Sequence, residues 1–162
     1  MVQSWLSESF ILFKPKDIVS GDFYWIEKAG DKIYFAVADC TGHGIPGAML
    51  TLMCMTFLDY AINHFNIVQP KEILEKVTDL ITNSFKSKGH EVKDGMDVSL
   101  LSWKTGSDKL LFSGANSKIL LLRDNEKNII KGDSRPVGLW VDKENKFSQQ
   151  EIKLKANDQI FM

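Results

Sequence analysis

The chain has 162 residues with a formal net charge of −1, and 44% of its residues are hydrophobic. This length and composition are ordinary for one globular domain with a core of its own. A charge this close to zero gives no reason to expect a nucleic acid or an anionic membrane as a partner. The two cysteines are too few for a disulfide framework, and no signal peptide opens the chain. A cytoplasmic location is therefore expected.

The first predicted elements are strands. Ser9–Lys14 reads as a short strand that stops at Pro15, and an aromatic-rich hairpin follows over residues 19–39. A two-residue turn in this hairpin sets Asp22 opposite Asp39. Opposed residues on antiparallel strands point to the same face, with Cβ atoms roughly 4.5–5.5 Å apart. Carboxylates this close repel each other unless a cation lies between them, and hard ions such as Mg²⁺ or Mn²⁺ suit them.

Two alternatives compete with this metal-site interpretation. Aspartate is common at strand ends, where it makes turn hydrogen bonds, and a register slip of one residue would put the carboxylates on different faces. Beyond the carboxylates, both faces of the hairpin carry apolar side chains, which predicts a layer on each side of the sheet. The Asp face has Tyr24, Ile26, Phe35 and Val37, and the other face has Phe23, Trp25, Tyr34 and Ala36.

Two helices are predicted next, over Pro46–His64 and Pro70–Lys86. The second shows one apolar face at helical spacing, which is typical of a helix that covers a sheet. The first contains a run from Ile45 to Ile62 in which only Asp59 is charged, so its length approaches that of a membrane span. Pro46 at its start and the absence of a basic flank favour a buried core helix.

Strands resume after the helices, and this order of elements favours an α+β fold with antiparallel sheets. Lys109–Ser113 and Lys118–Arg123 are predicted to form a hairpin around Gly114–Ser117. The other predicted strands are Met96–Trp103, Asn128–Lys131, Gln149–Leu154 and Gln159–Met162. Because the last strand is cut short, the domain is expected to be incomplete at its C-terminal end.

A glycine-rich turn follows the hairpin. Gly42, Gly44 and Gly47 match the spacing of a dinucleotide-binding turn. However, the strand before them belongs to a hairpin rather than a βαβ unit, and Asp39 would repel a pyrophosphate. A sharp turn beside a metal site, followed by a helix N-terminus that attracts an anion, fits better. A plain strand-to-helix turn and a nucleotide-binding turn remain the alternatives.

Several segments in order resemble the signatures of one family, the bacterial PP2C-type (PPM family) serine/threonine phosphatases. The subgroup they resemble contains the sporulation stage II E protein and the RsbU type. The resemblance covers residues 9–162, with residues 1–8 as an N-terminal extension. The matching segments are Lys14–Trp25, Val37–Ala48, Asp94–Leu100, Leu111–Ser117 and Arg135–Gly138.

The resemblance implies a PP2C-like αββα sandwich of two antiparallel sheets flanked by helices, here without its C-terminal strands and helices. It implies hydrolysis of phosphoserine or phosphothreonine by a metal-bridged hydroxide, with two Mn²⁺ or Mg²⁺ ions. Asp22, Asp39 and the backbone carbonyl of Cys40 would be metal ligands. His43 would be a general acid for the leaving group, against the alternative of a structural histidine in a tight turn.

Other residues have weaker assignments under this resemblance. Lys14 or Lys16 would replace the family's phosphate-binding arginine as a point charge, and Gly42 and Gly44 would also contact phosphate. For Asp94 and Asp97, a turn-capping role is favoured over an outer metal role. Asp158 matches a turn aspartate and not a ligand. The later aspartates that complete the family's metal site lie beyond the last residue, so weak or no activity is expected from residues 1–162 alone.

The resemblance also implies a phosphoprotein substrate, with an anti-sigma-factor antagonist as a candidate, and an upstream sensory domain in the full protein. Two other functions remain open. One is a phosphatase fold that binds a partner without catalysis, and the other is nucleotide binding by the glycine-rich turn.

Overall fold

The computed structural model describes residues 5–6, 8–15, 18–86, 94–138 and 146–162. Within them, one sheet has the strand order β1-β2-β3-β4-β8 with β7 paired to β3, and a second sheet has the order β6-β5-β9. The helices are α2 (Gly44–Asn63) and α3 (Pro70–Lys86). The strands are β1 (Asp22–Ala29), β2 (Lys32–Cys40), β3 (Gly95–Lys104), β4 (Lys109–Ala115), β5 (Lys118–Arg123), β6 (Glu126–Lys131), β7 (Val137–Gly138), β8 (Gln150–Lys153) and β9 (Gln159–Phe161).

The β1–β2 hairpin has the register that the sequence predicts. Asp22 pairs with Asp39 and Ala29 with Lys32, so the turn consists of two residues. Gly30 takes φ +62° in this turn, in the left-handed region that glycine enters without steric cost. The short turn fixes which side chains share a face, because it leaves the strands no freedom to slip.

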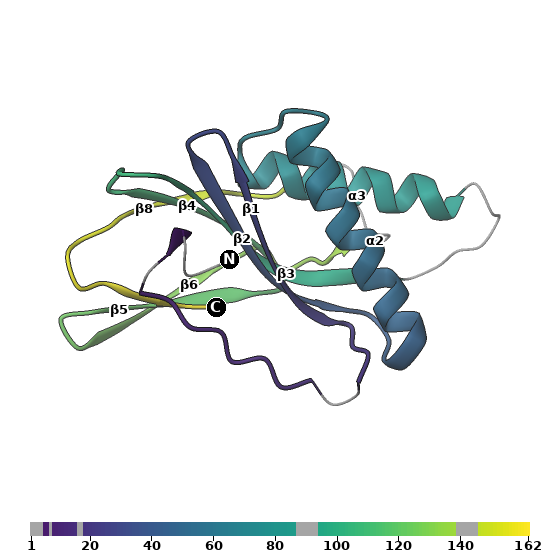
Figure 1. Cartoon of the computed structure of the whole chain (residues 1–162), viewed down its shortest axis with the longest axis horizontal. Helices are drawn as coiled ribbons and strands as arrows, with labels where there is room; N and C mark the ends of the chain where they lie inside the picture. Colours follow the sequence, from purple (N-terminus) through teal and green to yellow (C-terminus); the bar gives the residue numbers. More distant parts are fainter. Residues whose placement is uncertain (1–4, 7, 16–17, 87–93, 139–145) are drawn as a thin grey trace.

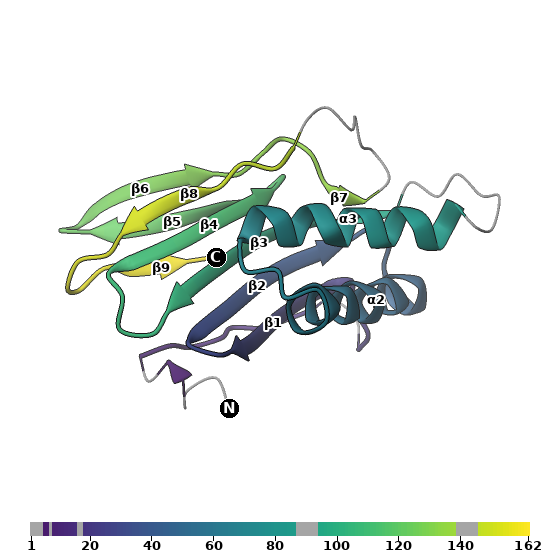
Figure 2. The same ribbon diagram turned by 90° about the horizontal axis from the view of Figure 1, so that it is seen from above.

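Both helices pack on one face of the first sheet, with α2 alongside β1 and α3 across β3 (Figure 2). The apolar side of the hairpin that includes Phe23, Trp25 and Tyr34 is buried beneath them. Trp25 also donates a hydrogen bond from Nε1 to Asp59 Oδ1 at 2.9 Å. This contact gives the one charged side chain of the apolar run a polar partner at the sheet.

In the described part of the chain, α2 is the one helix long and apolar enough to cross a membrane by length and composition. Seven of its residues are buried in the domain. These residues are Gly47, Leu50, Thr51, Cys54, Leu58, Ala61 and Ile62. Their burial agrees with the predicted core helix on the sheet-facing side only, because Ile45, Met49 and Leu52 are 70%, 67% and 67% exposed.

The second sheet packs on the opposite face of the first, which gives a helix, sheet, sheet order of layers (Figure 1). An inter-sheet core fills the space between the sheets, with Leu101 and Phe112 on one side and Ile119 and Leu121 on the other. The predicted α+β class with two antiparallel sheets is confirmed. The described residues form only one of the two helical layers of an αββα sandwich.

Two predicted elements are wrong. Ser9–Lys14 forms no strand. Phe10 is 79% exposed and Leu12 is 85% exposed, and no strand of the described residues pairs with the segment. The apolar pattern of the segment suited a strand, but a strand also needs a neighbouring strand to pair with, and the pattern does not show whether one is present. Phe13 instead places its ring at the edge of Tyr24, with 5.6 Å between the ring centroids.

The predicted hairpin of Lys109–Ser113 with Lys118–Arg123 is the second error. β4 pairs with β3 and β8 in the first sheet, whereas β5 pairs with β6 and β9 in the second. The chain crosses between the sheets at Asn116, which has φ +48°. A short polar turn permits either connection, and the burial of apolar side chains between the sheets selects the crossing.

The Asp face of the hairpin is covered only in part. Phe35 packs against the inter-sheet core, but Tyr24 and Val37, nearer the aspartates, are 42% and 40% exposed. The prediction that both faces are buried therefore holds for the helix side and fails at this end of the other side. The aspartate end of the hairpin remains open to solvent, and the candidate site lies there.

Candidate functional site

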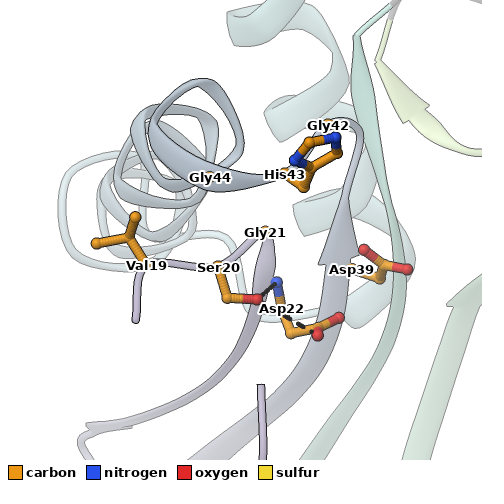
Figure 3. Close-up of a pocket in the computed structure, with 8 residues that line it drawn as sticks. All are labelled: Val19, Ser20, Gly21, Asp22, Asp39, Gly42, His43 and Gly44. Carbon is orange, nitrogen blue, oxygen red and sulfur yellow. Dashed lines mark hydrogen bonds between the residues drawn. The ribbon is translucent and has the colours of Figure 1, made fainter. Parts of the chain in front are cut away.

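A cavity of about 160 Å³ lies where the hairpin ends and α2 begins. It is lined by Val19, Ser20, Gly21, Asp22, Asp39, Gly42, His43 and Gly44 (Figure 3). Five of these residues were singled out by the sequence, and the structure brings them together. They are Asp22, Asp39, Gly42, His43 and Gly44. Ser20 is a lining residue that the sequence analysis did not identify.

Asp22 and Asp39 project from neighbouring strands into this open end, as Figure 3 shows. Ser20 orients Asp22 from the preceding loop: its Oγ accepts a hydrogen bond from the Asp22 backbone N at 2.9 Å and donates one to Oδ2 at 3.3 Å. A serine two residues before a strand-starting aspartate is a local signal that could have identified this contact.

Asp97 extends the pair to a third strand. It lies opposite Asp39 in the β2–β3 register, so Asp22, Asp39 and Asp97 form an acidic row across β1, β2 and β3. Its side chain accepts a hydrogen bond from Asn116 Nδ2 at 3.0 Å. The predicted turn-capping role of Asp97 is wrong, because the residue lies inside β3 and its partner is a side-chain amide.

The charges of the acidic row act on its central member. Partial desolvation raises the pKa of the Asp39 carboxyl, and the carboxylates of Asp22 and Asp97 raise that pKa further. The negative charges therefore lack a compensating cation among the described protein groups around Asp39. No three His, Cys, Asp or Glu side chains converge on one point in the described ranges. An ion here would consequently need backbone or water oxygens as well.

The glycine-rich turn lets α2 approach the start of β1 closely. A Cβ on Gly47 would lie 2.7 Å from the carbonyl oxygen of Gly42, so only glycine fits there. Thr51 on α2 donates a hydrogen bond from Oγ1 to the Gly21 carbonyl at 2.9 Å. The backbone N–H of Cys40 donates a hydrogen bond to the same Gly21 carbonyl at 3.1 Å. The ends of β1, β2 and α2 are thus held as one unit.

His43 stands at the N-cap of α2 with φ −135°, and its exposed ring makes no capping hydrogen bond with the described helix. It lies in the same cavity as the two aspartates, which its predicted role as general acid requires. That role stays a prediction.

The two lysines of the predicted phosphate site do not lie in the described cavity. Lys14 is exposed and is not one of the lining residues, and Lys16 falls outside the described residues.

Asp158, the predicted turn aspartate, forms an ion pair with Arg123 at 2.6 Å, far from the acidic row in the fold. Asp94 accepts a hydrogen bond from Thr41 Oγ1 at 3.0 Å just before β3 begins.

The hairpin leads through a glycine turn into a helix and has paired aspartates at its end. Its carboxylate oxygens could hold a cation, and the helix N-terminus beside them could attract an anion. The pairings of β2 are antiparallel on both sides, so the glycine turn does not belong to a βαβ nucleotide-binding unit.

Comparison with known proteins gives the family. The model of the stage II sporulation protein E family matches residues 29–162, and the chain belongs to this family of PP2C-type phosphatase domains. A search of curated proteins found no match.

Solved structures with the same fold include the SiaA PP2C domain of Pseudomonas aeruginosa, at 28% identity and a TM-score of 0.80. This chain is 93% covered by that match and spans 58% of the SiaA chain. The RsbU and RsbW domains of Rv1364c from Mycobacterium tuberculosis match at 20% identity and a TM-score of 0.70, over 90% of this chain and 38% of theirs. RsbX in complex with magnesium matches at 16% identity and a TM-score of 0.68, over 92% of this chain and 68% of its own.

Proposed function

We propose that this domain removes phosphate from phosphoserine or phosphothreonine on a bacterial signalling protein and requires Mn²⁺ or Mg²⁺ to do so. The observation that carries the proposal is the pairing of Asp22 with Asp39 in a cavity that also contains the first turn of α2. Family membership supports the same chemistry.

The residues present fit the metal that the family implies. Carboxylate oxygens on adjacent strands are the hard ligands that Mg²⁺ and Mn²⁺ prefer. Partial desolvation and the carboxylates of Asp22 and Asp97 raise the pKa of Asp39, and a bound cation would offset the repulsion between these carboxylates. Asp22, Asp39 and the Cys40 carbonyl would hold the metal, which when bound would activate water and stabilise charge on the phosphoryl group.

The chain's own groups have separate roles in this proposal. The backbone N–H groups at Gly42 and Gly44, next to the N-terminus of α2, would orient the phosphate. His43 would donate a proton to the serine or threonine oxygen that leaves. Ser20 would keep the Asp22 carboxylate aimed into the cavity through its two hydrogen bonds.

For the substrate we propose a phosphoprotein of a partner-switching system, such as an anti-sigma-factor antagonist, with a sensory domain ahead of the phosphatase domain. The support is the similarity to the chain that contains RsbU and RsbW domains and to a bacterial stressosome protein. Both likenesses are below 25% identity, so they establish the fold and leave the substrate as a proposal.

Calorimetric titration with Mn²⁺ tests the proposal directly. We expect Asp39→Asn to weaken Mn²⁺ binding at least tenfold, since a ligand is lost. In the full-length protein we expect it to lower Mn²⁺-dependent phosphate release from a phosphoserine peptide by about 100-fold or more. Asp79→Asn, on the exposed side of α3, is the matched control. Equal Mn²⁺ affinity in the original chain and the Asp39→Asn variant would refute the site. Mn²⁺ binding without turnover by the full-length protein would favour the non-catalytic binding module.

A further inference from the structure

We propose that Asp97 belongs to the metal site as the carboxylate beyond Asp39, and that Asn116 positions it. This inference rests on the proposed function, since it assigns a residue to the metal site described there. The residues assigned to that site so far are Asp22, Asp39 and the Cys40 carbonyl, all from the hairpin. Asp97 and Asn116 come from β3 and from the crossing between the sheets.

The strand registers place Asp97 correctly for this role. Asp39 is paired with Asp22 on one side and with Asp97 on the other, and directly paired residues project to the same face. Adjacent strands lie roughly 4.7–4.9 Å apart, so Asp22 and Asp97 are too far apart to share one ion. This agrees with the finding that no three such side chains converge on a point in the described residues.

A row of three carboxylates has two intervals, and each can receive a cation. Two-metal sites in hydrolases separate their ions by roughly 3.5–4 Å, which is close to the spacing of neighbouring strands. In this arrangement Asp39 would contact both ions, Asp22 one of them and Asp97 the other. The hairpin alone offers only the first interval.

Asn116 orients the Asp97 carboxylate. Its Nδ2 donates a hydrogen bond to Asp97 Oδ1 at 3.0 Å, which fixes the direction of the carboxylate. The other carboxylate oxygen has no hydrogen bond among those found in the described residues. The Asn116 backbone is fixed in turn, because its N–H donates to the Asp133 carbonyl at 2.8 Å.

A purely structural role for Asp97 makes a different prediction. If Asp97 served only to anchor Asn116 at the sheet crossing, its replacement would destabilise the domain with or without metal. If it is a ligand in a repelling row, its neutralisation should leave the metal-free domain at least as stable and should reduce the stabilisation by Mn²⁺. Thermal unfolding in chelator and in Mn²⁺ therefore separates the two roles.

The test compares the original chain with Asp97→Asn, Asp39→Asn and the Asp79→Asn control, by Mn²⁺ calorimetry and by thermal unfolding in both conditions. We expect Asp97→Asn to weaken Mn²⁺ binding at least tenfold and to unfold in chelator at the same temperature as the original chain or higher. Asn116→Ala keeps all three carboxylates, and we expect it to weaken Mn²⁺ binding about two- to fivefold. It replaces Asp97→Asn as the decisive variant if that protein does not fold.

The outcomes distinguish the two proposals. Normal Mn²⁺ affinity in Asp97→Asn, with affinity lost in Asp39→Asn, overturns the assignment of Asp97 and leaves the proposed function intact. A lower unfolding temperature in chelator with unchanged affinity assigns Asp97 a structural role and overturns the inference. Unchanged affinity in both variants, or no Mn²⁺ binding by the original chain, overturns the metal site itself and the inference with it.

Discussion

At the scale of single residues, the site depends on how each carboxylate is held. Partial desolvation raises the pKa of Asp39, and the two like charges on either side of it raise that pKa further. Asp22 and Asp97 each have one neutral hydrogen-bond donor, the Ser20 hydroxyl and the Asn116 amide respectively. These donors fix the direction of the carboxylates and leave the net negative charge in place, so the row stays attractive to a cation.

The Ser20 contact can be tested separately. We expect Ser20→Ala to lower Mn²⁺ affinity about tenfold, since losing a group that orients a ligand typically costs 10–100-fold in metal affinity. Ser20→Thr retains the hydroxyl and should retain most of the affinity. Mn²⁺ calorimetry on both variants measures the effect, and equal affinity in Ser20→Ala and the original chain would show that Asp22 needs no such support.

At the scale of elements, side chains join segments that the backbone alone does not connect. Trp25 links β1 to α2 through Asp59, and Arg123 on β5 links to Asp158 just before β9. Asp158 also accepts the backbone N–H of Lys155 at 2.8 Å, so it closes its own turn as well. The Asp158 side chain is only 4% exposed, so this ion pair stabilises the fold more than an ion pair between two exposed side chains would.

The Arg123 pair predicts a pH dependence of stability. The hydrogen bond from Arg123 lowers the pKa of Asp158 from 3.8 to about 2. A lowered pKa in the folded state means that the stabilisation is fully present above pH 4 and is lost as the pH falls toward 2. We expect Asp158→Asn to cost about 2 kcal/mol at pH 7, the value of a hydrogen bond to a charged group.

The measurement is denaturant unfolding of the original chain and Asp158→Asn between pH 2 and pH 7. The difference in free energy of unfolding between the two proteins should shrink as the pH falls from about 4 to about 2, because the original chain loses the ion pair there. A difference that stays constant over this range would contradict the assigned ion pair.

At the scale of the whole molecule, the first sheet separates two apolar layers, one against the helices and one against the second sheet. The inter-sheet core ends before it reaches the acidic row, where Val37 is 40% exposed. The inter-sheet core and the acidic row therefore lie on the same face of the first sheet but at different ends of it. Because of this separation, the acidic row is exposed to solvent while the inter-sheet core stays buried.

Phe112 tests the inter-sheet core. Its side chain is fully buried, so we expect Phe112→Ala to lower the free energy of unfolding by about 3–5 kcal/mol through lost burial and the cavity left behind. Leu52→Ala on the exposed side of α2, where Leu52 is 67% exposed, should change it little. Urea denaturation measures both, and a small loss for Phe112→Ala would mean that the sheets pack loosely.

The local features were readable from the sequence because short-range geometry fixes them. The two-residue turn at Gly30 sets the hairpin register and so the Asp22–Asp39 pair. The apolar periodicity of Pro70–Lys86 gives α3 with its bounds, because one face of a helix must be buried. The glycine-rich turn before α2 was also readable, although the helix begins at Gly44 and not at the predicted Pro46.

The long-range features were decided by the tertiary structure. Two helices separate β2 from β3, so no turn fixes the register that sets Asp97 opposite Asp39. Whether β4 and β5 form a hairpin or enter different sheets depends on where Phe112 and Ile119 are buried, which no single segment determines. The residues 9–14 have a strand-like pattern but find no pairing partner. The sequence by itself determined the paired aspartates and the family, whereas the third carboxylate of the row required the packing of the complete sheet.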